Sequence, residues 1–177
     1  MVGTLFRATP RHLLHTAMRT VLVTTGPNAV LQALDSLPEL TVIDAQQPFN
    51  DCIKAIRQAQ PGILITYRCP HIIPMSIIRD TALAVNIHPS MLPKYAGLNP
   101  WHDMMRQNET RGGVTIHRLT EKVDSGEIIC QREMTLDFSK GMQRNRDNAD
   151  TLAAEMIAGI MRRWGDQSQS AVGKEMT

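Results

Sequence analysis

The stretch ILITY, residues 63–67, is an almost uninterrupted run of β-branched and large apolar side chains. Such a run is typical of a strand that is buried on both faces of a parallel sheet. A second run of this kind, Leu83–His88, follows a short helical segment at 76–79. It ends at Pro89, whose ring cannot continue a hydrogen-bonded ladder. The two runs therefore predict central strands of a sheet.

The residues around these two runs alternate between the strand and helix patterns. Apolar strand patterns alternate with helical ones from residue 20 onward, which is typical of an α/β sheet with crossover helices. Two later strands alternate apolar and polar residues across a charged, glycine-ended connection, which favours a hairpin. We therefore predict a single α/β, Rossmann-like domain with a mostly parallel central sheet flanked by helices and a terminal antiparallel strand pair. The expected strands are 20–24, 40–43, 63–67, 83–88, 114–117 and 127–131, and the expected helices are 29–37, 50–59, 76–79 and 152–164.

The overall composition limits the class of protein. A chain of 177 residues with 42% hydrophobic residues fits one compact domain with a sizeable core. No apolar run approaches the roughly 18 residues of a membrane-spanning helix, and a net charge of +2 is too small to indicate nucleic acid. We expect a leader or disordered extension at 1–18, the domain at 19–164 and a polar tail at 165–177.

Cysteine usage and the first residues bear on the cellular compartment. Cys52, Cys69 and Cys130 are odd in number and lack CxxC spacing, which favours a reducing compartment and no protein-bound metal. We expect a cytoplasmic protein. Residues 1–17 contain arginines and hydroxyl residues but no acids, so an organellar transit peptide is the alternative to a disordered extension ahead of a start at Met18. A GxGxxG fingerprint is absent, which argues against a nicotinamide cofactor.

Two polar residues stand at the end of the strand 83–88. Asn86 and His88 are two apart, so their side chains leave the same face of the strand. Pro89 places them at a carboxyl strand end, where open α/β sheets bind ligands. An amide beside an imidazole can hold an oxyanion and manage a proton. By themselves, two such residues at a strand end more often satisfy loop backbone groups than take part in catalysis.

The residues that follow resemble the folate-dependent formyltransferase family. Members of that family carry an N-x-H-P-S-L-L-P segment, a following glycine, and an aspartate in a short D-[STA]-G segment about 36 residues after the histidine. Here 86–93 reads NIHPSMLP, Gly97 follows, 113–117 reads GVTIH, and 123–126 reads VDSG around Asp124. The resemblance covers residues 61–136 well and 20–60 loosely.

The resemblance implies an enzyme, a folate-dependent N-formyltransferase that uses 10-formyltetrahydrofolate as co-substrate and no metal. It implies that Asn86 and His88 stabilise the oxyanion, and that Asp124 stabilises the imidazolium and accepts a proton from the amine. Without the resemblance, Asp124 would be an ordinary turn residue, and we expect His117 to be a partly exposed strand histidine. Residues expected to shape the folate side are Ser90, Leu92, Pro93 and Val123, and those expected on the acceptor side are Gly97, Asn99 and Trp101.

Departures from the family pattern limit the classes of acceptor substrate that we expect. The phosphate loop of the glycinamide ribonucleotide branch is represented only by 26–28, and 13 residues without a basic stripe follow Trp164, which disfavours the methionyl-tRNA branch. We therefore expect a small-molecule amine acceptor, an amino-sugar nucleotide or glycinamide ribonucleotide, and no nucleic acid. A formyltetrahydrofolate hydrolase and a non-catalytic folate-binding protein remain alternatives. The sequence is compatible with a homodimer.

Overall fold

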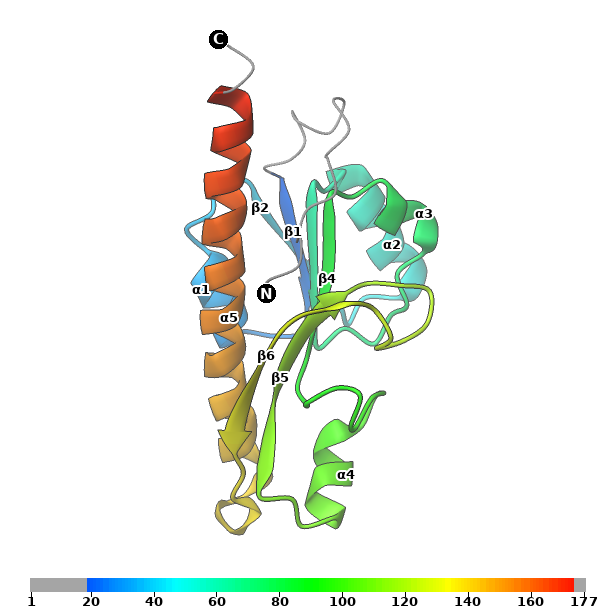
Figure 1. Cartoon of the computed structure of the whole chain (residues 1–177). Helices are drawn as coiled ribbons and strands as arrows, with labels where there is room; N and C mark the ends of the chain where they lie inside the picture. Colours follow the sequence, from blue (N-terminus) through cyan, green and yellow to red (C-terminus); the bar gives the residue numbers. More distant parts are fainter. Residues whose placement is uncertain (1–18, 174–177) are drawn as a thin grey trace.

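A six-stranded sheet forms the centre of the molecule, with helices on both faces (Figure 1). The computed structural model describes the backbone of residues 19–173 and the side chains of 19–165, so the expected leader at 1–18 lies outside the described residues. The strands are β1 (Thr20–Thr24), β2 (Leu40–Asp44), β3 (Ile63–Tyr67), β4 (Leu83–His88), β5 (Arg111–Arg118) and β6 (Ile128–Thr135). The helices are α1 (Ala29–Leu34), α2 (Phe49–Ala59), α3 (Met75–Arg79), α4 (Pro100–Arg106), the 3₁₀ turn η2 (Phe138–Lys140) and α5 (Met142–Gly173).

The strand order is β2-β1-β3-β4-β5-β6. The first four strands pair in parallel, whereas β5 pairs antiparallel with both β4 and β6. This topology confirms the predicted α/β class, including the antiparallel pair at the end. The chain runs from β1 outward to β2 and then returns to β3 on the other side of β1. The carboxyl ends of β1 and β3 therefore form a topological switch point, where α/β sheets bind ligands.

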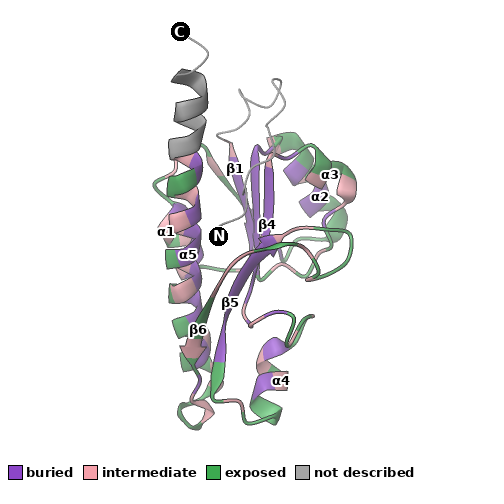
Figure 2. Ribbon diagram, in the orientation of Figure 1, coloured by how far each residue is buried: buried purple, intermediate pink, exposed green. Residues whose placement is uncertain are grey.

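Each face of the sheet carries its own apolar core. The alternation of side chains along β3 sends Ile63 and Ile65 to the face covered by α1 and α5, and Leu64 to the face covered by α2 and α3. Both cores are almost closed to solvent, as the buried strands in Figure 2 show. Burial on both faces explains why the strand patterns were continuous in the sequence.

Several elements differ from their predicted bounds. The helix α4 was not predicted, because its seven residues include only two that are buried, Pro100 and Met104. The helix α5 begins at Met142 and extends to Gly173, whereas the sequence pattern indicated a helix over 152–164 followed by a tail. Its first turns are rich in polar residues, so apolar periodicity does not reveal them. No helix among the described residues is both long and apolar enough to cross a membrane.

Candidate active site

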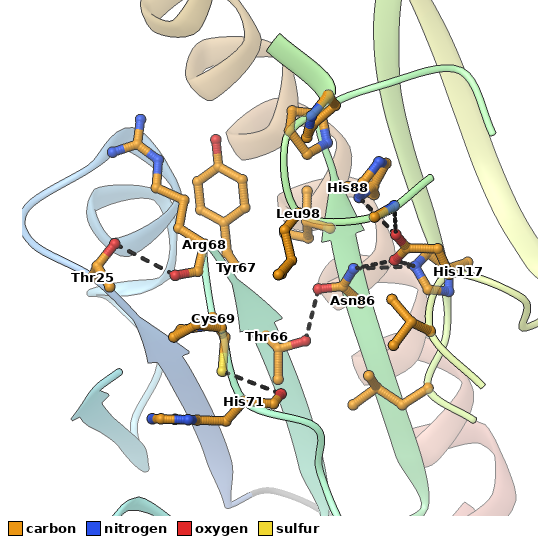
Figure 3. Close-up of a pocket in the computed structure, with 18 of the residues that line it drawn as sticks. Thr25, Thr66, Tyr67, Arg68, Cys69, His71, Asn86, His88, Leu98 and His117 are labelled. Atoms are coloured by element: carbon orange, nitrogen blue, oxygen red, sulfur yellow. Dashed lines mark hydrogen bonds and ion pairs between the residues drawn. The ribbon is translucent and has the colours of Figure 1, made fainter. Parts of the chain in front are cut away.

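A cavity of about 480 Å³ opens at the carboxyl ends of the central strands. The segments after β1 and β3 and the end of β4 form its floor, and the residues after β5 and the start of α5 complete its walls. Figure 3 shows Asn86, His88 and His117 gathered on one side, with Thr25 and Arg68 on the opposite side. The cavity therefore lies where a ligand site is expected for this sheet.

The three residues expected to be catalytic are brought together on one wall of this cavity. Asn86 and His88 leave the same face of β4, and Asp124 reaches them from the loop between β5 and β6. Nδ1 of His88 lies 3.3 Å from Oδ2 of Asp124. Nδ2 of Asn86 lies 3.4 Å from Oδ1 of the same carboxylate. One buried carboxylate thus contacts both side chains of the strand.

The backbone of the neighbouring loops holds Asp124 in place. The N–H of Gly97 donates to Oδ2 of Asp124 at 2.7 Å, which ties the loop after β4 to the loop after β5. Gly97 has a φ of +105°, a conformation that glycine adopts without strain, and a Cβ placed on it would meet nothing within 4 Å. Asp124 has a φ of +50°, a conformation that aspartate and asparagine tolerate better than most residues. The backbone of Gly126 packs directly against that of Arg118, and a Cβ on Gly126 would lie 1.9 Å from the Arg118 carbonyl oxygen.

Both ring nitrogens of His88 face oxygen atoms. Nε2 lies 2.8 Å from the carbonyl oxygen of Tyr95, which can only accept, so this nitrogen carries a proton. The second ring nitrogen faces Asp124, so a further proton taken up by His88 would lie between the two side chains. Burial lowers the pKa of His88, and the charge of Asp124 and the Tyr95 carbonyl offset only part of this effect. Burial therefore favours the neutral imidazole, and a carboxylate lies in position to stabilise its protonated form.

The carboxylate is kept ionised by its neighbours. Burial by itself would raise the pKa of Asp124, but contacts to His117 and the Gly97 N–H, together with the nearby His88, hold it below its ordinary value. The Asp124 side chain is only 6% exposed. The pair formed by Asp124 and His88 is therefore an anionic base that is shielded from water.

Two residues that the sequence did not assign to the site complete this network. His117 was expected to be partly exposed, but it is 2% exposed, because β5 lies between two strands and its end faces the cavity. Its Nε2 lies 3.1 Å from Nδ2 of Asn86 and 3.4 Å from Oδ1 of Asp124. Thr66 donates from Oγ1 to Oδ1 of Asn86 at 2.8 Å. The strand register explains both contacts, because Asn86 pairs with Thr66 of β3 on one side and with His117 of β5 on the other, and no local sequence pattern shows this pairing.

The remaining predicted site residues fall into two groups. Val123, Gly97 and Trp101 line the cavity, whereas the cavity walls do not include Asn99, Ser90, Leu92 or Pro93. Ser90 is fully buried, and its hydroxyl donates to the carbonyl oxygen of Lys94 at 2.7 Å. Ser90 therefore shapes the loop after β4 from behind, and its hydroxyl is bonded to the backbone.

The far side of the cavity holds a second polar cluster. Asp150 of α5 accepts from the Tyr67 hydroxyl and pairs with the guanidinium of Arg68. Burial and the contact with Asp150 raise the pKa of Tyr67. Arg146 lies one turn before Asp150 on the same helix and also lines the cavity. Among the described residues, no group of three or more His, Cys, Asp or Glu side chains is arranged to hold a metal ion.

Comparison with known proteins assigns this arrangement to a family. A model of the formyl transferase family matches residues 26–157, which include the whole cluster of Asn86, His88 and Asp124. This chain belongs to the formyl transferase family. It is 32% identical over 106 residues, 59% of its length, to a methionyl-tRNA formyltransferase of Lysinibacillus sphaericus, of which it covers 34%. The chain thus spans about a third of the length of the curated relatives it matches.

Solved structures share the fold of this member of the family. Glycinamide ribonucleotide transformylase 1 of Symbiobacterium toebii superposes with a TM-score of 0.66 at 17% identity, over 80% of this chain and 84% of that chain. A formyltetrahydrofolate deformylase of Pseudomonas syringae pv. tomato superposes with a TM-score of 0.63 at 21% identity, over 84% and 61% of the two chains. The polar C-terminal residues disfavoured the methionyl-tRNA branch, but the similarity to a protein of that branch does not support an exclusion of nucleic acid.

Proposed function

We propose that this formyl transferase moves the formyl group of 10-formyltetrahydrofolate to a primary amine. The observation that carries the proposal is the convergence of Asn86, His88 and Asp124 on one wall of the cavity. A neutral imidazole, an ionised buried carboxylate and an amide donor are the groups that formyl transfer to an amine requires. Membership of the family supports the same reaction class.

The reaction forms one bond and breaks one bond. The nitrogen of the amine attacks the formyl carbon, and the electron pair of the carbonyl bond moves to its oxygen. When this pair returns, the bond between the formyl carbon and N10 of the folate breaks. The proton lost by the attacking amine ends on N10, so atoms and charge balance. The protein has to stabilise the negative oxygen and carry this proton.

The cluster can do both. The buried pair of His88 and Asp124 can take the proton of the amine, since a protonated imidazole would lie 3.3 Å from the carboxylate that stabilises it. The imidazolium then provides positive charge beside the negative oxygen. Asn86 can donate an N–H to that oxygen if the amide exchanges its present contact with Asp124 for the substrate, and contacts of this kind often tighten only in the complex. Loss of one such donor typically costs about 10²–10³ in turnover.

The rim of the cavity supports a flat, largely apolar donor. Ile72, Leu98 and Val123 line the cavity from three different loops and are 59%, 79% and 49% exposed. Apolar side chains exposed at a cavity mouth commonly mark a binding site. We assign the folate to this side, with Val123 next to Asp124 in the chain. The residues opposite, toward β1, β3 and α5, are then left for the acceptor.

For the acceptor we propose a small-molecule amine, namely an amino-sugar nucleotide or glycinamide ribonucleotide. The volume of about 480 Å³ supports a donor head group together with a small acceptor. A methionyl-tRNA acceptor is the competing choice, since relatives from several bacteria, among them Lysinibacillus sphaericus and Thermotoga maritima, act on methionyl-tRNA by their names.

The test is incubation of the purified chain with 10-formyltetrahydrofolate and each amine in turn, following release of tetrahydrofolate. We expect release that depends on a small amine and that is lost in Asn86→Ala. If methionyl-tRNA supports release and none of the small amines does, the acceptor is methionyl-tRNA. Equal release without any amine would indicate hydrolysis. No release under any of these conditions would contradict the proposed activity.

A further inference from the structure

Arg146 is the one cationic side chain of the cavity that is partly buried and unpaired among the described residues. Its Nε is buried and has no hydrogen-bond partner there. A buried donor of this kind is costly unless something binds it, because a charged donor leaves water without compensation. Arg146 lines the same cavity as His88 and Asp124. The guanidinium thus carries a charge that no described residue neutralises, on a side chain that borders the cavity.

Neither carboxylate that lines the cavity forms an ion pair with Arg146. Asp150 lies four residues after Arg146 in α5, a spacing that suits an ion pair on one helix face. Its two oxygens are instead taken by the Tyr67 hydroxyl and the Arg68 guanidinium. The other lining carboxylate, Asp124, contacts His88 and His117 on the opposite wall. Arg68 is therefore neutralised, and the positive charge of Arg146 is not.

The loop after β1 does not compete for an anion with its side chains. The side chain of Asn28 accepts from the Leu31 N–H at 3.0 Å and donates to Thr24 and to the Gly26 carbonyl. It thereby caps α1 and closes its own turn, and the cavity walls include Thr25 but not residues 26–28. Lys122 also lines the cavity but is exposed on the loop after β5, so the partly buried free cation among the described residues is Arg146 on α5.

We infer that Arg146 forms an anion-binding subsite for the acceptor, which is a primary amine carrying a phosphate or carboxylate group. This inference rests on the proposed formyl transfer. The guanidinium presents a planar set of donors that matches both anions. The amine end of such an acceptor reaches toward Asn86 and His88, while its anionic end contacts Arg146 beside the switch point of β1 and β3.

The acceptor is favoured over the folate as the occupant of this subsite. The exposed apolar rim of Ile72, Leu98 and Val123 suits the aromatic donor, whereas the wall formed by Thr25, Arg68, Asp150 and Arg146 is polar. The Michaelis constants of the two substrates separate these assignments. Loss of Arg146 raises the KM of the acceptor and leaves the KM of the folate donor unchanged.

The first arm of the test measures binding without turnover. Inorganic phosphate and acetate are titrated by calorimetry into the full chain, into Arg146→Gln and into Arg144→Gln. Arg144 is an exposed arginine on the same helix that does not line the cavity, so it is the matched control. We expect Arg146→Gln to weaken binding of at least one anion by roughly 10- to 100-fold, the range for a charged hydrogen bond, with Arg144→Gln like the unaltered chain. The anion that responds identifies phosphate or carboxylate. Equal binding by both variants would overturn the inference.

The second arm uses amines that differ only in their tail, namely ethanolamine, phosphoethanolamine and β-alanine. We expect kcat/KM for an anionic amine to exceed that for ethanolamine, and this preference to disappear in Arg146→Gln but not in Arg144→Gln. Transfer with no such preference, or a raised KM for the folate donor instead, overturns the subsite and leaves the proposed function standing. Anion binding that depends on Arg146 without transfer to any amine supports the subsite and contradicts the formyl transfer.

Discussion

Nδ1 of His88 lies 3.3 Å from Oδ2 of Asp124, and both side chains are 6% exposed. The two residues are 36 positions apart, on β4 and on the loop between β5 and β6. The antiparallel pairing of β4 with β5 places Arg118, the last residue of β5, beside Val85, so the loop that carries Asp124 begins next to the strand that carries the histidine. A base and its counter-charge thus meet at the cavity wall.

Removal of the charge of Asp124 should abolish most of the formyl transfer without unfolding the protein. Asp124→Asn keeps the shape and tolerates the φ of +50°, but it cannot stabilise a protonated His88. We expect kcat to fall by about 10²–10⁴, the range for a positioned acid or base, in an assay of tetrahydrofolate release. Asp103→Asn, which alters a partly exposed pair with Arg106, is the control and should stay near the unaltered rate. An active Asp124→Asn enzyme would refute the role of this carboxylate.

The titration of His88 should reflect its burial. Its pKa lies below the ordinary value of about 6.5, and we expect Asp124→Asn to lower it further, since the charge of Asp124 raises it. The measurement is NMR of the imidazole Cε1–H signals, assigned with His88→Gln. A pKa that rises in Asp124→Asn would contradict the geometry.

The same shift has a consequence for stability. In the unfolded chain His88 binds its proton more readily than in the folded one, so folding loses free energy as the pH falls below about 6.5. This loss grows until the folded-state pKa is passed. The unfolding free energy of the unaltered chain should therefore decline more steeply between pH 7.5 and acid pH than that of His88→Gln. Parallel pH profiles from denaturant titrations would argue against it.

Thr66 should act on the reaction through Asn86. Its hydroxyl donates to Asn86 at 2.8 Å, and Thr66 is 2% exposed. Thr66→Val preserves the shape but leaves a poorly satisfied amide oxygen, which costs about 1–3 kcal/mol of unfolding free energy. We expect kcat to fall by roughly 10- to 100-fold with little change in KM, because the amide is no longer held in one orientation. Thr66→Ser restores the hydroxyl and should recover most of kcat; failure of this rescue would indicate a packing effect only.

Gly126 should tolerate no side chain. A Cβ at this position would lie 1.9 Å from the backbone oxygen of Arg118, so the loop that carries Asp124 has to move. We expect Gly126→Ala to lose more than about 2 kcal/mol of unfolding free energy, as overpacked sites do, together with its activity. Gly159→Ala is the matched control, since the nearest atoms to its Cβ are side-chain ends of Arg162 and Arg163 at 3.9 Å. In the middle of α5 it should gain about 0.5–1 kcal/mol. Similar thermal denaturation midpoints for the two variants would contradict this prediction.

The strands were readable from the sequence because their burial is local in origin. β1, β3 and β4 carry continuous apolar runs, and each was predicted with the bounds that the structure shows. The helix α4 was missed, since a segment of seven residues has little periodicity, and only Pro100 and Met104 of it are buried. The first turns of α5 were missed for a similar reason.

The sequence by itself determined the α/β class and singled out Asn86, His88 and Asp124. A strand that ends in Asn-x-His-Pro and a short aspartate segment at the family's spacing are local patterns, which need no knowledge of distant contacts. Only the tertiary structure decided that His117 and Thr66 join them, and that Arg146 faces the same cavity while Asp150 is occupied by Tyr67 and Arg68. These contacts join residues that are far apart in the chain. The pairing of the strands and the packing of α5 set which side chains meet, and no local pattern encodes that choice.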